Sequence, residues 1–368
     1  MEKVRAFLAR KNITFSAKRY FIDAMSAMAQ GLFCTLLVGT ILDTIGKQFG
    51  IGFLTDTFLT IKQGDVTFYY TIGGFCSLMV GPAMAVAIGK ALEAPPLVLF
   101  SLITVGFATN VLGGTGGPLA VFFVAILAAE VGKAISKETK IDILVTPIVT
   151  ILAGIGFAAL VARPIGTAAT SVGDAIKWAT ELQPFFMGIL VSVIIGVALT
   201  LPISSAAICA ALGLTGLAGG AAVAGCCAQM VGFAVMSFRE NRWGGLAAQG
   251  IGTSMLQMGN IVRNPRIWIP PTLASAITGP IATCIFRMEM NGAPVSSGMG
   301  TCGLVGQIGV YTGWVNDIAA GTKAAITGMD WLGLVLISFL LPAVLTWLIA
   351  IPLRKWGWIK EGDLKLDL

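Results

Sequence analysis

Long apolar runs recur along the 368-residue chain, at lengths that suit membrane-spanning helices. Strict alternation of apolar and polar residues, which is typical of membrane barrel strands, does not recur. The pattern predicts an all-α polytopic membrane protein. Segment 48–63 is too short and interrupted to cross, and segment 163–181 is mildly amphipathic and suits a membrane interface. The predicted spans are 21–45, 66–89, 95–112, 119–135, 141–161, 184–212 (with a kink at Pro202), 268–286 and 331–352.

Two glycine-rich segments interrupt this pattern. The first covers residues 214–238, and the second covers residues 288–311 and reads MEMNGAPVSSGMGTCGLVGQIGVY. Glycine is a poor helix former, and irregular backbone at membrane depth must be buried in protein or line a water-filled cavity. We predict that the second segment is re-entrant and lies at the floor of a substrate site. The alternative stays open that both are helices packed through small side chains.

Composition narrows the class of protein. The chain is 56% hydrophobic and 11% charged, whereas soluble domains carry about 25% charged residues, so a soluble enzyme is excluded. Residues 1–20 hold six Lys or Arg and no short apolar region with a cleavage site, which predicts a cytoplasmic amphipathic helix rather than a signal peptide. The net charge of +6 reflects basic loops and does not indicate nucleic-acid binding.

The distribution of Lys and Arg predicts the orientation, because basic loops stay cytoplasmic. Residues 1–20, 133–140, 239–266 and 354–368 hold six, three, four and four basic residues, while loops 47–62, 163–177 and 287–330 hold two each. This distribution fits eight crossings with both termini cytoplasmic if both glycine-rich segments are re-entrant hairpins, one from each face. Hairpins that meet near the midplane are typical of transport sites. The predicted division is an N-terminal helix (1–20), a transmembrane domain (21–353) and a cytoplasmic tail (354–368).

Several kinds of chemistry find no support. The chain has no histidine, and its seven cysteines lie in apolar or glycine-rich stretches without zinc-like spacing. No P-loop is present. We therefore expect neither a metal nor a cofactor. Acidic residues at membrane depth are too few for a convincing ion or proton path, so ion transport is disfavoured.

Glu289 is the strongest candidate for chemistry, because it lies between an apolar span and the polar glycine-rich stretch. A carboxylate can accept hydrogen bonds from sugar hydroxyls or act as a base. The alternative is a surface residue paired with Arg287. Glu93 and Glu130, at the cytoplasmic ends of spans, are more typical of salt bridges. Amides, which recognise neutral polyols, gather around the glycine-rich breaks, although each could instead join helices; the candidates are Asn110, Gln229, Gln257, Asn260, Asn291 and Gln307.

Four runs of sequence carry a family resemblance: IWIPPTLASAITGPIATCIFRMEMNGAPVSSGMGTCGLVGQIG, APPLVLFS, GGTGGPLAVFF and KIDILVTPIVTILAG. Together they resemble the stand-alone enzyme IIC proteins of the bacterial phosphotransferase system, in the subgroup that includes perfringolysin-type toxin regulators. The resemblance implies a sugar-translocating subunit in the bacterial cytoplasmic membrane, a homodimer with a scaffold portion and a mobile substrate-carrying portion. It also implies that Glu289, with Asn291 beside it, contacts a sugar hydroxyl.

Two departures from that family bear on activity. Characterised relatives often carry a histidine near the substrate, and this chain has none. No phosphocysteine loop of a fused IIB domain is recognisable, so phosphoryl transfer would require separate IIA and IIB partners. The expected function is therefore uptake of a carbohydrate or related polar solute, with Glu289 positioning or deprotonating the hydroxyl. The alternatives are a membrane sensor that binds the same ligand without phosphorylating it, and a facilitator or secondary transporter.

Overall fold

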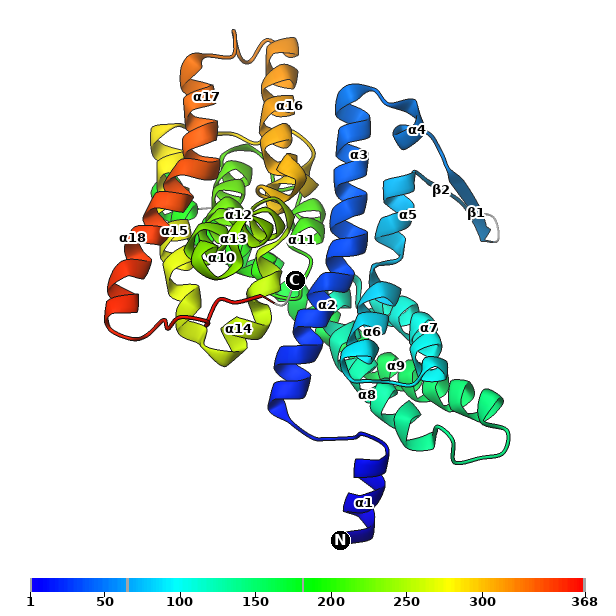
Figure 1. Cartoon of the computed structure of the whole chain (residues 1–368). Coiled ribbons are helices and arrows are strands. Elements are labelled where there is room, and N and C mark those ends of the chain that lie inside the picture. Colours follow the sequence, from blue (N-terminus) through cyan, green and yellow to red (C-terminus); the bar gives the residue numbers. More distant parts are fainter. Residues whose placement is uncertain (1, 64–65, 181, 367–368) are drawn as a thin grey trace. The chain divides into compact units, whose positions relative to one another are not determined.

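The computed structural model describes residues 2–63, 66–180 and 182–366. The chain forms two compact units, Met1–Ala168 and Ala169–Leu368, both built almost entirely from helices (Figure 1). Among the described residues, five helical segments are long and apolar enough to cross a membrane, or six if one bent pair counts as a span. An all-α polytopic membrane protein is thereby confirmed. The eight crossings and two hairpins are not established by this count.

The first unit begins with a helix held by ion pairs. Arg10 and Lys11, at the end of α1, approach the Glu138 carboxylate at 2.7 and 2.5 Å. Lys11 also donates to the Ser136 carbonyl, and the Asn12 amide donates to Glu93. These contacts attach α1 to the loop between α8 and α9. The elements of this unit are α1 (Glu2–Arg10), α2 (Met25–Leu32), α3 (Val38–Phe49), α4 (Gly52–Thr55), β1 (Leu59–Gln63), β2 (Val66–Tyr70), α5 (Ile72–Leu78), α6 (Val80–Ala91), α7 (Pro96–Gly113), α8 (Gly117–Ile135) and α9 (Asp142–Thr180, which continues into the second unit), with π-helical turns at Lys18–Ala24 and Phe33–Leu37 and a 3₁₀ turn at Gly114–Gly116.

Acidification is expected to loosen α1. The pKa of Glu138 lies below its usual range, chiefly because Lys11 donates a hydrogen bond to it, with the charge of Arg10 adding to the effect. A depressed pKa means that the attachment is complete above the unfolded-state pKa and is lost as the pH falls through the folded-state pKa. The protection of the amides in residues 2–13, measured relative to their intrinsic exchange rate at each pH, should therefore fall as the pH drops from about 7 to about 3. Glu138→Gln should lower this protection already near pH 7, and the exposed Glu361→Gln should not. Equal protection in all three proteins would show that these ion pairs do not hold α1.

The predicted start of the second span, at residue 66, is wrong. Residues 66–70 form a strand that pairs antiparallel with β1, Leu59 opposite Tyr70, so the second span cannot begin at residue 66. The helical part is the pair α5 and α6, bent by 49°. The bend falls just before Pro82, which has no N–H to donate to the preceding turn.

The helices α7 and α8 correspond to the predicted third and fourth spans. Between them Gly114 has a φ of +52°, which L side chains rarely adopt, so the chain reverses there. A Cβ at Gly132, near the end of α8, would lie 2.8 Å from Val98, near the start of α7. The two helices therefore fold back on each other. By contrast, the predicted break near residue 162 is absent, because α9 continues through Pro147 and Pro164; a proline can bend a helix without ending it.

The second unit holds the remaining apolar helices. Its predicted run 184–212 is interrupted: α10 ends at Thr200, and Leu201 is extended, as the residue before a proline prefers. The elements are α10 (Pro184–Thr200), α11 (Ser205–Ala211), α12 (Gly216–Met236), α13 (Phe238–Ala247), α14 (Met258–Arg263), α15 (Ile269–Pro280), α16 (Val305–Ala319), α17 (Gly328–Val335) and α18 (Leu341–Lys355), with π-helical turns at Ala248–Gly252, Ile281–Ile285 and Leu336–Leu340 and 3₁₀ turns at Ser254–Gln257, Pro265–Trp268, Pro294–Gly298 and Cys302–Leu304.

The first glycine-rich segment is one helix, not a hairpin. α12 runs through 21 residues and is almost wholly buried inside the unit. Its glycines let neighbouring helices approach closely, since a Cβ at Gly225 would lie 1.9 Å from the Ser192 carbonyl oxygen of α10. This close packing explains how a glycine-rich helix persists, because tight contact with neighbours offsets its poor intrinsic propensity.

Candidate functional site

The second glycine-rich segment is irregular from residue 288 to residue 304, as predicted. Between the π-helical turn that ends at Ile285 and the start of α16 at Val305, the structure has only two 3₁₀ turns. Much of this backbone is buried, and protein groups satisfy it: Ser205 donates to the Gly298 carbonyl at 2.8 Å, and Ser297 donates to the Leu214 carbonyl at 2.7 Å. Residues 305–311, the end of the segment, belong to α16. The segment therefore lies within the protein, as irregular backbone in a membrane must.

The start of α12 fixes the position of the segment. Gly216 and Met290 exchange two backbone hydrogen bonds, at 3.1 and 3.0 Å. One turn further along α12, a Cβ at Gly220 would lie only 1.7 Å from the Met288 carbonyl oxygen. Glu289 is thus held between two residues that are fixed against α12, and its own side chain is exposed.

Glu289 opens into a polar cavity of about 390 Å³. Asn291 lines this cavity and donates to Glu289 Oε2 at 3.1 Å and to Asp317 Oδ2 at 2.9 Å, while its own oxygen accepts from the Gly216 N–H. Lys323 and Asp330 also line the cavity, and the Lys323 ammonium donates to Asp330 Oδ1 at 2.8 Å. The full lining is Arg287, Glu289, Asn291, Trp314, Asp317, Thr322, Lys323 and Asp330.

This arrangement suits a neutral polyol. Two carboxylates that share one amide offer several acceptors in fixed directions, and Lys323 offers donors. Trp314 borders the cavity with only 4% of its surface exposed, and its ring centroid lies 6.0 Å from the Lys323 ammonium. The volume falls in the range of ligand pockets, about 300–1,000 Å³. Among the described residues Glu289 has no ion-pair partner, so the predicted alternative of pairing with Arg287 is not what holds it.

Sequence reasoning missed Asp317, Trp314, Lys323 and Asp330. A signal for two of them was present, because Trp314 and Asp317 are three residues apart and share a face of α16. Asp330 also caps α17, where its carboxylate accepts from the Thr327 N–H. Nothing local in the sequence indicates that these residues converge on Glu289.

Two of the candidate amides lie away from the cavity and join helices. Gln229 is fully buried on α12, where its oxygen accepts from the Trp268 indole at 2.9 Å and its nitrogen donates to Thr272 at 3.3 Å. Gln307 on α16 donates to Ser338 at 2.9 Å, and its Oε1 is buried without a hydrogen-bond partner. Their substrate contact stays a prediction, with the present contacts favouring helix packing.

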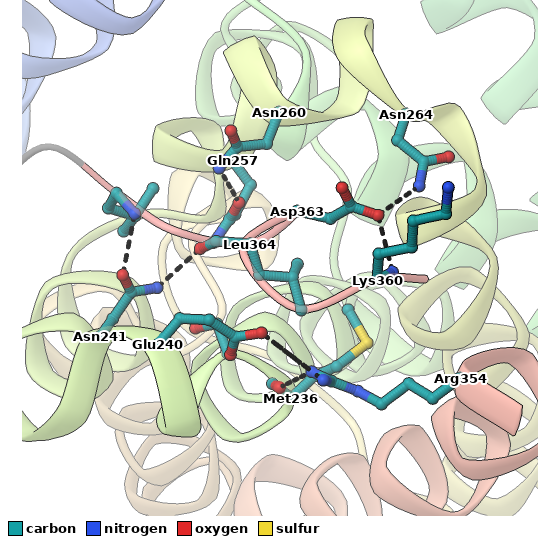
Figure 2. A network of polar contacts seen from close by, with 12 residues as sticks. Met236, Glu240, Asn241, Gln257, Asn260, Asn264, Arg354, Lys360, Asp363 and Leu364 are labelled. Atoms are coloured by element: carbon teal, nitrogen blue, oxygen red, sulfur yellow. Dashed lines mark hydrogen bonds and ion pairs between the residues drawn. The ribbon is translucent and has the colours of Figure 1, made fainter. Parts of the chain in front are cut away.

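Two more candidate amides hold the C-terminal strap, which we define as residues 356–366 (Figure 2). Gln257 donates to the Leu364 carbonyl at 3.0 Å, and Asn260 donates to the Lys365 carbonyl at 2.8 Å. Asn241 donates to the Leu364 carbonyl and accepts from the Leu366 N–H, at 2.7 and 2.8 Å. Leu364 itself is fully buried. The amides around the glycine-rich breaks thus bind a segment of the chain more than 100 residues away.

Asn241→Ala is expected to loosen the strap. The variant loses both hydrogen bonds that the Asn241 side chain makes to it, each contributing about 0.5–1.5 kcal/mol. Hydrogen exchange of the Leu366 amide should rise roughly 10-fold, as measured by mass spectrometry of the purified protein. Asn316→Ala, which alters an exposed asparagine on α16, is the control. An unchanged Leu366 amide would mean that other contacts hold the strap.

The remaining candidates belong to the first unit. Asn110 lies on α7, where its carbonyl and side chain would meet a Cβ on Gly117 within 2.5 Å, so it marks a close approach of α7 and α8. Glu130 pairs with Lys133 at 2.9 Å and accepts from the Tyr20 hydroxyl at 3.2 Å. Glu93 accepts from Asn12. Glu130 and Glu93 are thus engaged in contacts within this unit.

The family model described as "Phosphotransferase system, EIIC" matches residues 22–366, nearly the whole chain. The chain belongs to this EIIC family. The protein is therefore an integral membrane subunit of a phosphotransferase transport system, a family that implies a polar substrate and separate IIA and IIB partners. No curated protein and no solved structure matches the chain.

Proposed function

We propose that this EIIC protein transports a carbohydrate that binds in the cavity lined by Glu289, Asn291 and Asp317. The shared hydrogen bonds of Asn291 carry the proposal, because they fix two carboxylates at the same cavity. Carboxylate–hydroxyl hydrogen bonds are charge-assisted and favour a substrate with several hydroxyl groups.

Glu289 is proposed as the residue that positions or deprotonates the reacting hydroxyl. Its side chain is exposed to the cavity, and one of its oxygens accepts from Asn291. The other oxygen can accept from a substrate hydroxyl. The phosphoryl group comes from a separate phosphorylated IIB protein, since the cavity holds no histidine and no cysteine that could carry it. Because the orientation proposed below makes this cavity open to the outside, the proposal includes a movement of the substrate-carrying portion that brings the bound sugar to the cytoplasmic side before IIB reacts with it. Asn291 and Asp317 then orient Glu289 and the substrate.

The test uses the full chain in phospholipid vesicles, a panel of hexoses and disaccharides, and phosphorylated IIB. Formation of a sugar phosphate that depends on both the chain and IIB is the expected result. Tight binding of a sugar that no IIB partner phosphorylates would contradict the proposal and indicate a sensor. Uptake without phosphorylation would replace it with a facilitator.

Orientation and assembly are further parts of the proposal. Both termini are placed in the cytoplasm, because residues 1–20 and 354–368 are both basic. Since α12 is one helix, the basic segment 239–266 shares their side only if the chain returns between the end of α10 at Thr200 and the start of α12 at Gly216, and this return is part of the proposal. Residues 286–304 then enter from the outside as a re-entrant segment. The chain acts as a homodimer. Single cysteines at exposed Lys137 and Thr322, in a cysteine-free background, should react with an impermeant maleimide from opposite sides of the membrane.

A further inference from the structure

A second cavity lies where two apolar spans of the second unit end. It measures about 660 Å³, and its walls come from the end of α12, from α13 and from the last two turns of α18. The spans Gly216–Met236 and Gly328–Lys355 both terminate at it. The deeper wall is apolar, with Val235, Leu246 and Ile351 among its members. A cavity at this level marks the boundary between the apolar membrane core and the polar surface.

Three basic residues border this cavity, namely Arg239, Arg354 and Lys355. Arg354 is fixed, because its guanidinium donates to the Met236 carbonyl at 2.9 Å and lies 3.5 Å from Glu240. Arg239 and Lys355 are exposed, and neither has an ion-pair partner among the described residues. With Glu240 offsetting Arg354, the rim presents two uncompensated positive charges above an apolar wall.

Two tryptophans also line the cavity. Trp243 is 74% exposed and packs edge-on against Phe238, with ring centroids 5.2 Å apart. Trp347 is 54% exposed and lies seven residues before Arg354 on α18, about 10 Å deeper along the helix axis. Tryptophan is enriched at membrane interfaces, where its ring is apolar and its N–H can reach polar groups.

We propose that this cavity binds an anionic phospholipid, with the headgroup phosphate at Arg239 and Lys355 and the upper acyl chain along Ile351 and Trp347. Basic residues beside membrane-spanning helices bind anionic headgroups, and each Lys or Arg contributes about the same favourable free energy as the next. The apolar depth requires an acyl chain, so a free phosphate ion fills only the rim. A soluble acidic peptide is disfavoured, because α12 and α18 lead away from the rim into the membrane. This proposal does not depend on the sugar cavity at Glu289.

The test is a lipid titration of the detergent-purified full chain, followed by native mass spectrometry. Dioleoyl-phosphatidylglycerol should bind at least 10-fold more tightly than dioleoyl-phosphatidylcholine. The double variant Arg239→Gln, Lys355→Gln should weaken binding of the anionic lipid roughly 20- to 30-fold, since two basic contacts are lost. The matched variant Arg263→Gln, Lys365→Gln removes two exposed basic side chains outside the cavity and should leave binding unchanged.

A third variant tests the acyl chain separately from the charges. Ala350→Phe places a larger side chain at the apolar wall of the cavity. It should weaken the binding of phosphatidylglycerol and leave the basic residues of the rim unchanged. Thermal unfolding without added lipid checks that each variant folds. If Ala350→Phe does not fold, the two double charge variants decide the test by themselves. Equal binding of the two lipids, equal losses in the two double variants, or full competition by soluble glycerol phosphate would each overturn the proposal.

Discussion

Glu289→Gln is expected to fold normally and to lose most of its transport activity. Glutamine keeps the shape and can still accept from Asn291, but it cannot take a proton, and it loses a charge-assisted bond contributing about 1.5–3 kcal/mol. Sugar binding to the purified protein should weaken roughly 10- to 100-fold. Phosphorylation by IIB should fall roughly 10²- to 10⁴-fold if Glu289 acts as the base.

Two matched variants sharpen this result. Glu361→Gln removes a carboxylate from the exposed end of the chain and should leave binding and phosphorylation unchanged. Asp317→Asn removes the charge of the second carboxylate that accepts from Asn291 and should weaken binding without the additional loss in phosphorylation rate. Normal phosphorylation by Glu289→Gln would remove Glu289 from the proposed chemistry. Equal losses in all three variants would indicate a general effect of charge.

Gly220→Ala is expected to destabilise the protein and to disturb the same cavity. Its Cβ would lie 1.7 Å from the Met288 carbonyl oxygen, and this neighbour is backbone that cannot rotate away. Overpacking of this kind costs about 3 kcal/mol, more than the roughly 1 kcal/mol that alanine contributes in a helix. The melting temperature in detergent should fall, and sugar affinity should fall with it because Met288 adjoins Glu289.

The control for this variant is Gly244→Ala. Gly244 lies on exposed helix α13, and a Cβ there would meet nothing within 4 Å. Alanine at this position should leave the melting temperature unchanged or raise it slightly. A Gly220→Ala protein as stable as the parent would show that α12 and residues 288–290 can separate at little cost, so that contact would not position Glu289.

The class of fold could be predicted because membrane solvation acts on local composition. Runs such as 95–112 and 119–135 are recognisable from length and hydropathy alone, and the break at Gly114 lies between them. The ends of several helices were harder to predict from the sequence. The end of α10 depended on Pro202, and the persistence of α12 depended on helices that pack against its glycines, which no local pattern specifies.

The candidate site divides in the same way. Glu289 and Asn291 stood out in sequence because polar residues beside irregular backbone are rare in so apolar a chain. The amides Gln257 and Asn260 stood out equally, yet they bind the C-terminal strap more than 100 residues away. An amide has the same hydrogen-bonding groups in both settings, so the residue type cannot reveal the partner.

The sequence by itself determined that this chain is a helical membrane protein with an irregular, polar stretch that begins near residue 288. That outcome follows from how water and lipid solvate each stretch of the chain, so it does not depend on which residues pack together. Only the tertiary structure decided that Asp317 shares Asn291 with Glu289, and that the other amides join helices or hold the strap. Those outcomes depend on distances between residues far apart in the chain, and such distances follow from packing rather than from any local pattern.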